Sequence, residues 1–172
     1  MGFATAVRTC LSKYISFSGR ASRPEYWWFL LFVVLGSLVF GLLDGVLFGV
    51  DIETGESQGA LAPLWQLAMF IPLLAAGWRR LQDTGRPGWY ILLPMLVSLV
   101  SVVGLFLGIF TFGVMEQNVA DPDSLRGPAA VLGLTGIAVI GIVQLVLTVL
   151  MLWWLTRPSD PGANAYGSPA AS

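Results

Sequence analysis

Residues 26–43, YWWFLLFVVLGSLVFGLL, contain no Asp, Glu, Lys or Arg. Three further long stretches also lack these charged residues, at 57–78, 87–115 and 127–156. A helix that crosses the hydrocarbon core of a bilayer needs roughly 20 apolar residues. The four stretches therefore predict an all-α membrane protein with four transmembrane helices, over residues 25–50, 60–78, 89–115 and 131–155.

The composition of the 172-residue chain agrees with this prediction, because 56% of its residues are hydrophobic and 11% are charged. Soluble domains usually carry about 25% charged residues. The composition therefore excludes an ordinary water-soluble domain, a disordered chain and a disulfide-rich secreted module. The chain has no histidine and one cysteine, Cys10, so we expect no intrachain disulfide, metal site or cofactor. With a net charge of −1 and no basic domain, no nucleic-acid partner is expected.

Residues 3–17, FATAVRTCLSKYISF, place apolar side chains on one side of a helix and polar side chains on the other. This pattern predicts an amphipathic helix in the membrane interface, or a short helix packed on the rest of the protein, and the two are compatible. Ser22 and Glu25 have the spacing of a capping box at the start of the first transmembrane helix, with Pro24 in its first turn. No cleavable signal peptide is expected, because the N-terminal segment lacks a compact apolar core.

The basic residues and the tryptophans predict the orientation in the membrane. Four helices place both termini and the middle loop on one side, which holds eight of the nine basic residues: Arg8, Lys13, Arg20, Arg23, Arg79, Arg80, Arg86 and Arg157. Arg126 is on the other side, and an excess of Lys and Arg marks the cytoplasmic face. Six of the seven tryptophans fall at the same ends, where indole rings anchor at headgroup level: Trp27, Trp28, Trp78, Trp89, Trp153 and Trp154.

These patterns divide the chain into three segments. Residues 1–25 are a cytoplasmic amphipathic segment, and residues 26–156 form the four-helix transmembrane domain. Residues 157–172 are rich in Pro, Gly, Ser and Ala, which predicts a flexible cytoplasmic tail with local order only around residues 164–167.

Small residues recur every four positions in the first transmembrane helix, at Ser37, Gly41, Gly45 and Gly49. Such a ridge lets another helix approach closely. It predicts packing within the monomer or, as the alternative, the seam of a homodimer. The later helices offer similar positions at Gly104, Gly108, Ala129, Gly133 and Gly141.

Two polar residues interrupt the apolar stretches. Counting from Trp27, Asp44 lies near the outer interface, which predicts a structural or interfacial carboxylate. Gln144 lies closer to the middle of the membrane and is expected to hydrogen-bond to a neighbouring helix. No pair of ionisable groups falls at mid-depth, so the sequence gives little support to a proton-coupled pump.

Three segments on the basic side carry most of the remaining polar residues: 17–28, 78–90 and 161–167. Asp83 is the one acid among Arg79, Arg80 and Arg86, and lies at the depth of the arginines before the first helix. We expect an Asp–Arg network that staples the first segment to the second, while the other arginines face anionic headgroups. The alternatives are arginines that only set the topology, and a ligand or substrate site.

The same segments resemble the bacterial inner-membrane proteins of domain-of-unknown-function family 805, through three ordered motifs. The first motif matches Phe17, Gly19, Arg20, Arg23, Glu25, Tyr26 and Trp27; the second matches Arg79, Arg80, Leu81, Asp83, Gly85, Gly88 and Trp89; the third matches Gly162, Asn164, Tyr166 and Gly167. One position departs from the pattern, because Gln82 stands where the family usually has histidine. The resemblance implies an inner-membrane location and supplies no activity.

Together these observations favour a non-enzymatic membrane module that organises lipids or protein partners through a cytoplasmic Arg/Asp/Trp face. Its expected partners are membrane lipids, including anionic headgroups, and a second copy or another membrane protein. The alternative is a small transporter or channel subunit. Catalysis by Asp83 on a lipid headgroup is less favoured, because no nucleophile–base pair or metal site accompanies it.

Overall fold

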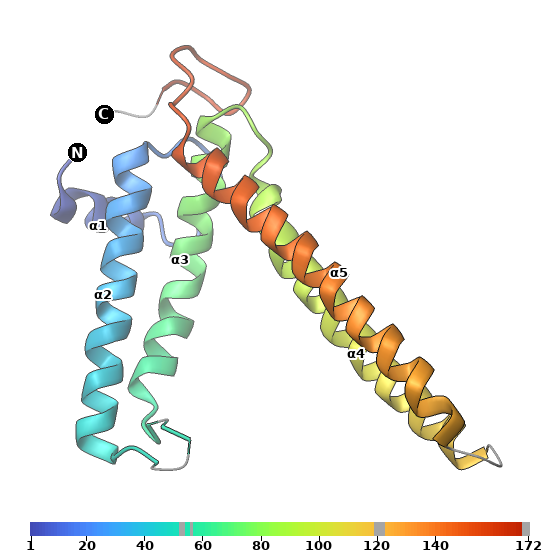
Figure 1. The fold of residues 1–172 in the computed structure, drawn as a ribbon. Coiled ribbons are helices and arrows are strands. Elements are labelled where there is room, and N and C mark those ends of the chain that lie inside the picture. Colours follow the sequence, from blue (N-terminus) through green and yellow to red (C-terminus); the bar gives the residue numbers. More distant parts are fainter. Residues whose placement is uncertain (52–53, 56, 119–122, 170–172) are drawn as a thin grey trace. The chain divides into compact units, whose positions relative to one another are not determined.

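The computed structural model describes residues 1–51, 54–55, 57–118 and 123–169 (Figure 1). Its elements in chain order are α1 (Phe3–Ser12), α2 (Arg23–Phe48), α3 (Leu61–Asp83), the 3₁₀ helix η1 (Gly88–Leu92), α4 (Leu93–Asn118) and α5 (Asp123–Thr156). Four helical segments are long and apolar enough to cross a membrane, within α2, α3, η1–α4 and α5. This confirms the predicted all-α class with four spanning helices and a short N-terminal helix.

The chain divides into two compact units. The first consists of Met1–Tyr90 together with Trp154–Ser172, and the second of Ile91–Trp153.

The start of α2 lies close to the residue that the capping pattern predicted. The Ser22 hydroxyl accepts a hydrogen bond from the Glu25 N–H at 3.4 Å, and Pro24 occupies the first turn. The other half of the predicted capping box is wrong, because the Glu25 carboxylate accepts from Arg79 instead. A guanidinium is a stronger partner for a buried carboxylate than a neutral backbone amide is.

The contact between α2 and α3 is built around Trp65. Its indole Nε1 donates to the Val33 carbonyl at 3.0 Å. Its ring lies against Gly36, where an added Cβ would come within 2.2 Å of the ring. Phe32 and Phe40 pack on the same indole, with centroid distances of 5.4 and 5.0 Å. Trp65 therefore lies between the two helices.

The predicted glycine ridge of α2 does not make this contact. An added Cβ at Gly41 would have no neighbour within 4 Å among the described residues, and one at Gly45 would meet only Val50, at 3.4 Å. Gly49 follows the last residue of α2 with a φ of +79°. Gly36 precedes the ridge residue Ser37, and one residue turns a helix by about 100°, so the ridge faces away from Trp65. An added Cβ at Gly104, Gly108, Gly133 or Gly141 would likewise meet no described atom within 4 Å.

Asp44 closes the far end of the α2–α3 pair. Its carboxylate is fully buried and accepts from the N–H groups of Leu61 and Ala62, at 3.0 and 2.7 Å. These are the first two residues of α3, whose N–H groups have no partner within the helix. The negative charge also interacts favourably with the helix dipole. Asp44 thus has the structural role that its predicted depth favoured.

Pro72 removes one hydrogen bond from the middle of α3, and the chain after α1 replaces it. Because proline has no N–H, the Ala68 carbonyl lacks its usual partner four residues later. The Tyr14 hydroxyl donates to that carbonyl. The segment that follows α1 is therefore tied to α3 at the position where the helix ladder is interrupted.

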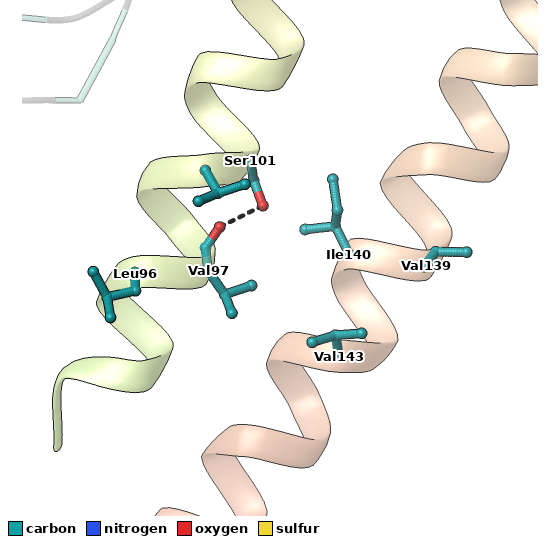
Figure 2. Close-up of a pocket in the computed structure, with 7 residues that line it drawn as sticks. Leu96, Val97, Ser101, Val139, Ile140 and Val143 are labelled. Carbon is teal, nitrogen blue, oxygen red and sulfur yellow. Dashed lines mark hydrogen bonds between the residues drawn. The ribbon is translucent and has the colours of Figure 1, made fainter. Parts of the chain in front are cut away.

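In the second unit, α4 and α5 lie side by side (Figure 1). An apolar groove of about 290 Å³ lies between them, and Figure 2 shows Leu96, Val97 and Ser101 of α4 opposite Val139, Ile140 and Val143 of α5. The Ser101 hydroxyl donates to the Val97 carbonyl of its own helix at 2.6 Å. The side-chain oxygen of Gln144 is buried and has no partner among the described residues, so the hydrogen bond expected there is not seen.

Candidate functional site

Five charged side chains gather at one end of the first unit, where the chain enters α2 and leaves α3. They are at most 6% exposed as residues and will be called the arginine cluster: Arg20, Glu25, Arg79, Arg80 and Asp83. Three cations and two carboxylates are thus taken out of water together. Removing one isolated charge from water costs roughly several kcal/mol of folding free energy. The fold therefore tolerates these charges only if they are well paired.

Asp83 is the centre of the cluster. One carboxylate oxygen accepts from Arg20 Nε at 2.8 Å, and the other accepts from Arg80 Nη1 at 2.5 Å. The charge argument predicted a salt bridge between Asp83 and an arginine, and the structure confirms it. The position differs from the expected surface staple, because Asp83 and Arg80 are fully buried. α3 continues five residues beyond Trp78, the end that hydropathy predicted, and this carries both side chains inward.

Arg79 and Glu25 form the second ion pair, at 2.7 Å. The Cys10 thiol of α1 lies 3.8 Å from the same carboxylate oxygen, which joins α1 to the pair. Burial, and then the charge of Glu25, raise the pKa of the Cys10 thiol to about 12. Cys10 is therefore a packed thiol rather than a thiolate nucleophile at neutral pH. One nitrogen of Arg79, Nη2, is buried without a partner in the described part of the chain.

Arg20 binds the C-terminal tail. Its guanidinium donates to the carbonyls of Asp160 and Gly162, at 2.5 and 2.6 Å, and more weakly to Gly167 at 3.4 Å. The Asp160 N–H donates in turn to the Asp83 carbonyl at 3.0 Å. Residues 160–167 are therefore attached to the cluster, whereas the composition predicted order only around residues 164–167. Composition missed this attachment because backbone carbonyls make the contacts, whatever side chains surround them.

The third sequence motif forms the turn that Arg20 holds. Asn164 donates through Nδ2 to the Gln82 carbonyl at 3.0 Å and accepts from the Tyr166 N–H at 2.9 Å. The backbones of Asn164 and Gly167 exchange two hydrogen bonds. Gly167 adopts a φ of +123°, a backbone conformation that residues other than glycine rarely adopt. The motif therefore encodes a local turn that docks on the end of α3.

Arginines also cap the C-terminal end of α5. Arg80 donates through Nε to the Leu155 carbonyl at 3.0 Å and through Nη2 to the Arg157 carbonyl. Arg23 donates to the Thr156 carbonyl between them at 3.4 Å. The last carbonyls of a helix lack partners within it and carry its negative partial charge. They help to balance the cation that the two carboxylates leave unneutralised.

Gln82 occupies the position where the resemblance leads us to expect histidine. With its amide oriented to suit its neighbours, it donates to the carbonyls of Gly19 and Phe17, at 2.7 and 3.2 Å, and accepts from Trp78 Nε1 at 3.1 Å. A neutral imidazole also offers one donor and one acceptor. Gln82 therefore supplies hydrogen bonds on two sides without a titrating group.

The other motif residues lie at the edge of the cluster. Gly85 turns the chain after α3 with a φ of +74°, and an added Cβ at Gly88 would come within 2.0 Å of the Trp78 ring. Trp27 is partly buried and packs edge-on against Tyr26. Arg23 and Trp89 are exposed. The structure therefore brings most of the predicted site residues together, but as one packed polar core rather than as an open face.

Some contributors to the site were not among the predicted residues. Cys10 contributes through its thiol, and Asp160 contributes through its backbone. The position of Asp160 between Pro158 and Pro161 carries no periodic signal that would identify it. Among the described residues, no group of three or more His, Cys, Asp or Glu side chains has the arrangement of a metal site.

Comparison with known proteins identifies the family. A family model described as "Protein of unknown function (DUF805)" matches residues 14–168. Inner membrane protein YhaH of Escherichia coli (strain K12) is 40% identical over 118 residues, which cover 69% of this chain and 94% of the relative. Inner membrane protein YhaI of the same strain is 39% identical over 108 residues, which cover 63% and 85% of the two chains. No solved structure matches at a significant level.

Proposed function

The chain belongs to the DUF805 family of inner-membrane proteins, and we propose that it is a non-enzymatic module that organises lipids or protein partners through its cytoplasmic face. The observation that carries the proposal is the burial of the arginine cluster. The Asp83 carboxylate is paired with two guanidiniums. Arg20 and Arg80 in turn pair with Asp83 and donate hydrogen bonds to backbone carbonyls. These groups connect the N-terminal segment, the end of α3 and the tail into one packed platform.

The platform presents a second, outer set of charges. Five basic side chains of the first unit are exposed or partly exposed: Arg8, Lys13, Arg23, Arg86 and Arg157. Among the described acids at this end, Glu25 and Asp83 are buried, and Asp160 is partly exposed. Exposed cations beside a membrane attract anionic lipids with roughly 1 kcal/mol each. The same charges suit the acidic surface of a protein partner.

Purification of the full chain in a mild detergent, followed by mass spectrometry of the retained lipids and proteins, tests the proposal. We expect anionic lipid or a defined protein to be enriched over the bulk membrane. A variant with all five of these exposed or partly exposed basic residues replaced by Gln should lose most of that enrichment. Retention identical to that of an unrelated four-helix membrane protein purified in the same way would contradict the proposal.

The alternative is a small transporter or channel subunit. Transport would need polar side chains along a path through the helices. The groove between α4 and α5 is lined by apolar side chains and Ser101, whose hydroxyl is bound within α4. Solute or ion flux through reconstituted vesicles would favour the alternative, and flux equal to that of protein-free vesicles would favour the module.

A further inference from the structure

We propose that Arg86 and Arg157, with the face of Trp154, bind the phosphate diester of an anionic phospholipid headgroup. The inference rests on the proposed function and specifies its ligand class and place. All three residues belong to the first unit, at the end that carries the arginine cluster.

Arg86 has the unused donors that such a ligand requires. Its guanidinium lies over the Trp154 ring, 5.3 Å from the ring centroid, and this cation–π contact uses none of its N–H groups. Within the part of the chain that the structure describes, its guanidinium makes one hydrogen bond, from Nη1 to the Thr84 carbonyl at 3.2 Å. A guanidinium has five N–H donors, and its fork matches two phosphate oxygens. Among the described residues the other donors of Arg86 meet no acceptor, so they are available to a ligand.

The local charge also calls for an anion. Partial burial, and then the nearby charge of Arg157, lower the pKa of Arg86, whereas Asp160 raises it. Asp160 is the one acid among these three charged groups, and its carboxylate already accepts from Asn164 Nδ2 at 3.3 Å. The Arg86 guanidinium therefore lies close enough to a second cation for its charged form to be disfavoured. A phosphate diester bound beside it would add a negative charge that offsets this repulsion.

Aromatic residues place this corner at the depth of lipid headgroups. The rings of Trp154 and Tyr90 lie 5.4 Å apart, and Trp89 packs edge-on against Tyr90 at 4.7 Å. Trp89 is 47% exposed. Tryptophan and tyrosine collect at the membrane–water interface, where phosphates are found. A lipid headgroup therefore suits the site better than a soluble anion, because a soluble anion would make no favourable contact with the surrounding aromatic rings.

Native mass spectrometry of the full chain in a neutral detergent, titrated with phosphatidylglycerol or phosphatidylcholine, tests the proposal. We expect preferential binding of phosphatidylglycerol, weakened about fivefold by Arg86→Gln and similarly by Arg157→Gln. Lys13→Gln is the matched control, because it removes one exposed charge beside α1 and should leave binding nearly unchanged. Arg86→Lys should bind with intermediate affinity, since it keeps the charge but loses the fork and the stacking. Thermal unfolding in the same detergent checks that every variant is folded.

The outcomes separate this inference from the proposed function. Equal weakening by Arg86→Gln and Lys13→Gln would overturn the site, because attraction would then be diffuse, but would leave the lipid-organising module standing. Displacement of the lipid by an equal concentration of inorganic phosphate would overturn the headgroup assignment. Equal binding of the two lipids by the wild-type chain would overturn the inference and the lipid part of the proposed function together.

Discussion

At the scale of single residues, Asp83 has the largest expected effect. Asp83→Asn keeps the size of the side chain and leaves Arg20 and Arg80 buried without their shared counter-charge. Breaking a buried pair by removing one partner typically costs about 3–5 kcal/mol. We expect a strongly lowered unfolding temperature in detergent and faster protease cleavage near Arg20–Arg23 in inverted vesicles. Asp51→Asn, in the partly exposed segment after α2, should change neither.

The Tyr14 hydroxyl is a more local test. Tyr14→Phe leaves the Ala68 carbonyl without its donor, at an expected cost of about 1 kcal/mol. Pro72→Ala restores the backbone N–H that would bind the same carbonyl. In a double-mutant cycle, Tyr14→Phe should therefore cost less in the Pro72→Ala background. Equal unfolding free-energy changes in both backgrounds would show that the hydroxyl does not substitute for the missing N–H.

Sequence reasoning reached part of this residue-level picture. It predicted the Asp83 salt bridge because one acid among several arginines near a membrane surface relieves their repulsion. It did not predict the pairing of Arg79 with Glu25, which depends on how far α3 continues. Nor did it predict that Arg20 binds the carbonyls of residues 160–167, because every residue has a carbonyl and only the folded backbone shows which ones converge.

At the scale of helices, the close contact of α2 with α3 falls at Gly36 rather than on the glycine ridge. Gly36→Leu should force the Trp65 ring out of place, and overpacking of this kind costs about 1–3 kcal/mol. Gly45→Leu is the matched control, because its side chain would enter nearly open space. We expect a lowered unfolding temperature for the first variant and little change for the second. A lowered temperature for both would show that another helix or a second copy covers the ridge.

Helix positions were predictable where apolar length decided them, and helix ends were not. Hydropathy located four spanning helices, because a run of apolar residues of that length has few other stable environments. It ended α3 at Trp78, since Arg79, Arg80 and Asp83 suggest a solvated loop. The structure keeps them helical because their charges neutralise one another inside the protein. Composition cannot show such pairing before the tertiary contacts are known.

At the scale of the whole molecule, the distribution of basic residues predicts which end faces the cytoplasm. Eight of the nine basic residues are predicted on the side that holds both termini, and the arginine cluster belongs to the same group of residues. The three buried arginines serve the fold as well, but they still count during insertion, when the chain is not yet packed. These three arginines therefore contribute both to the orientation in the membrane and to the stability of the fold.

Cysteine labelling tests this topology. In a Cys10→Ser background, single cysteines at Glu53 and Asp121, which lie outside the described residues, should react with an impermeant maleimide in whole cells. A cysteine at Ser168 should react only after the membrane is opened, because the tail is expected in the cytoplasm. To test whether the basic residues set this orientation, the exposed Arg8 and Lys13 should be replaced. Replacing Arg20 or Arg80 would also disturb the fold, because both are buried in ion pairs. Labelling of Ser168 but not of the two loops in intact cells would reverse the orientation, placing the basic platform and its proposed lipid site in the periplasm.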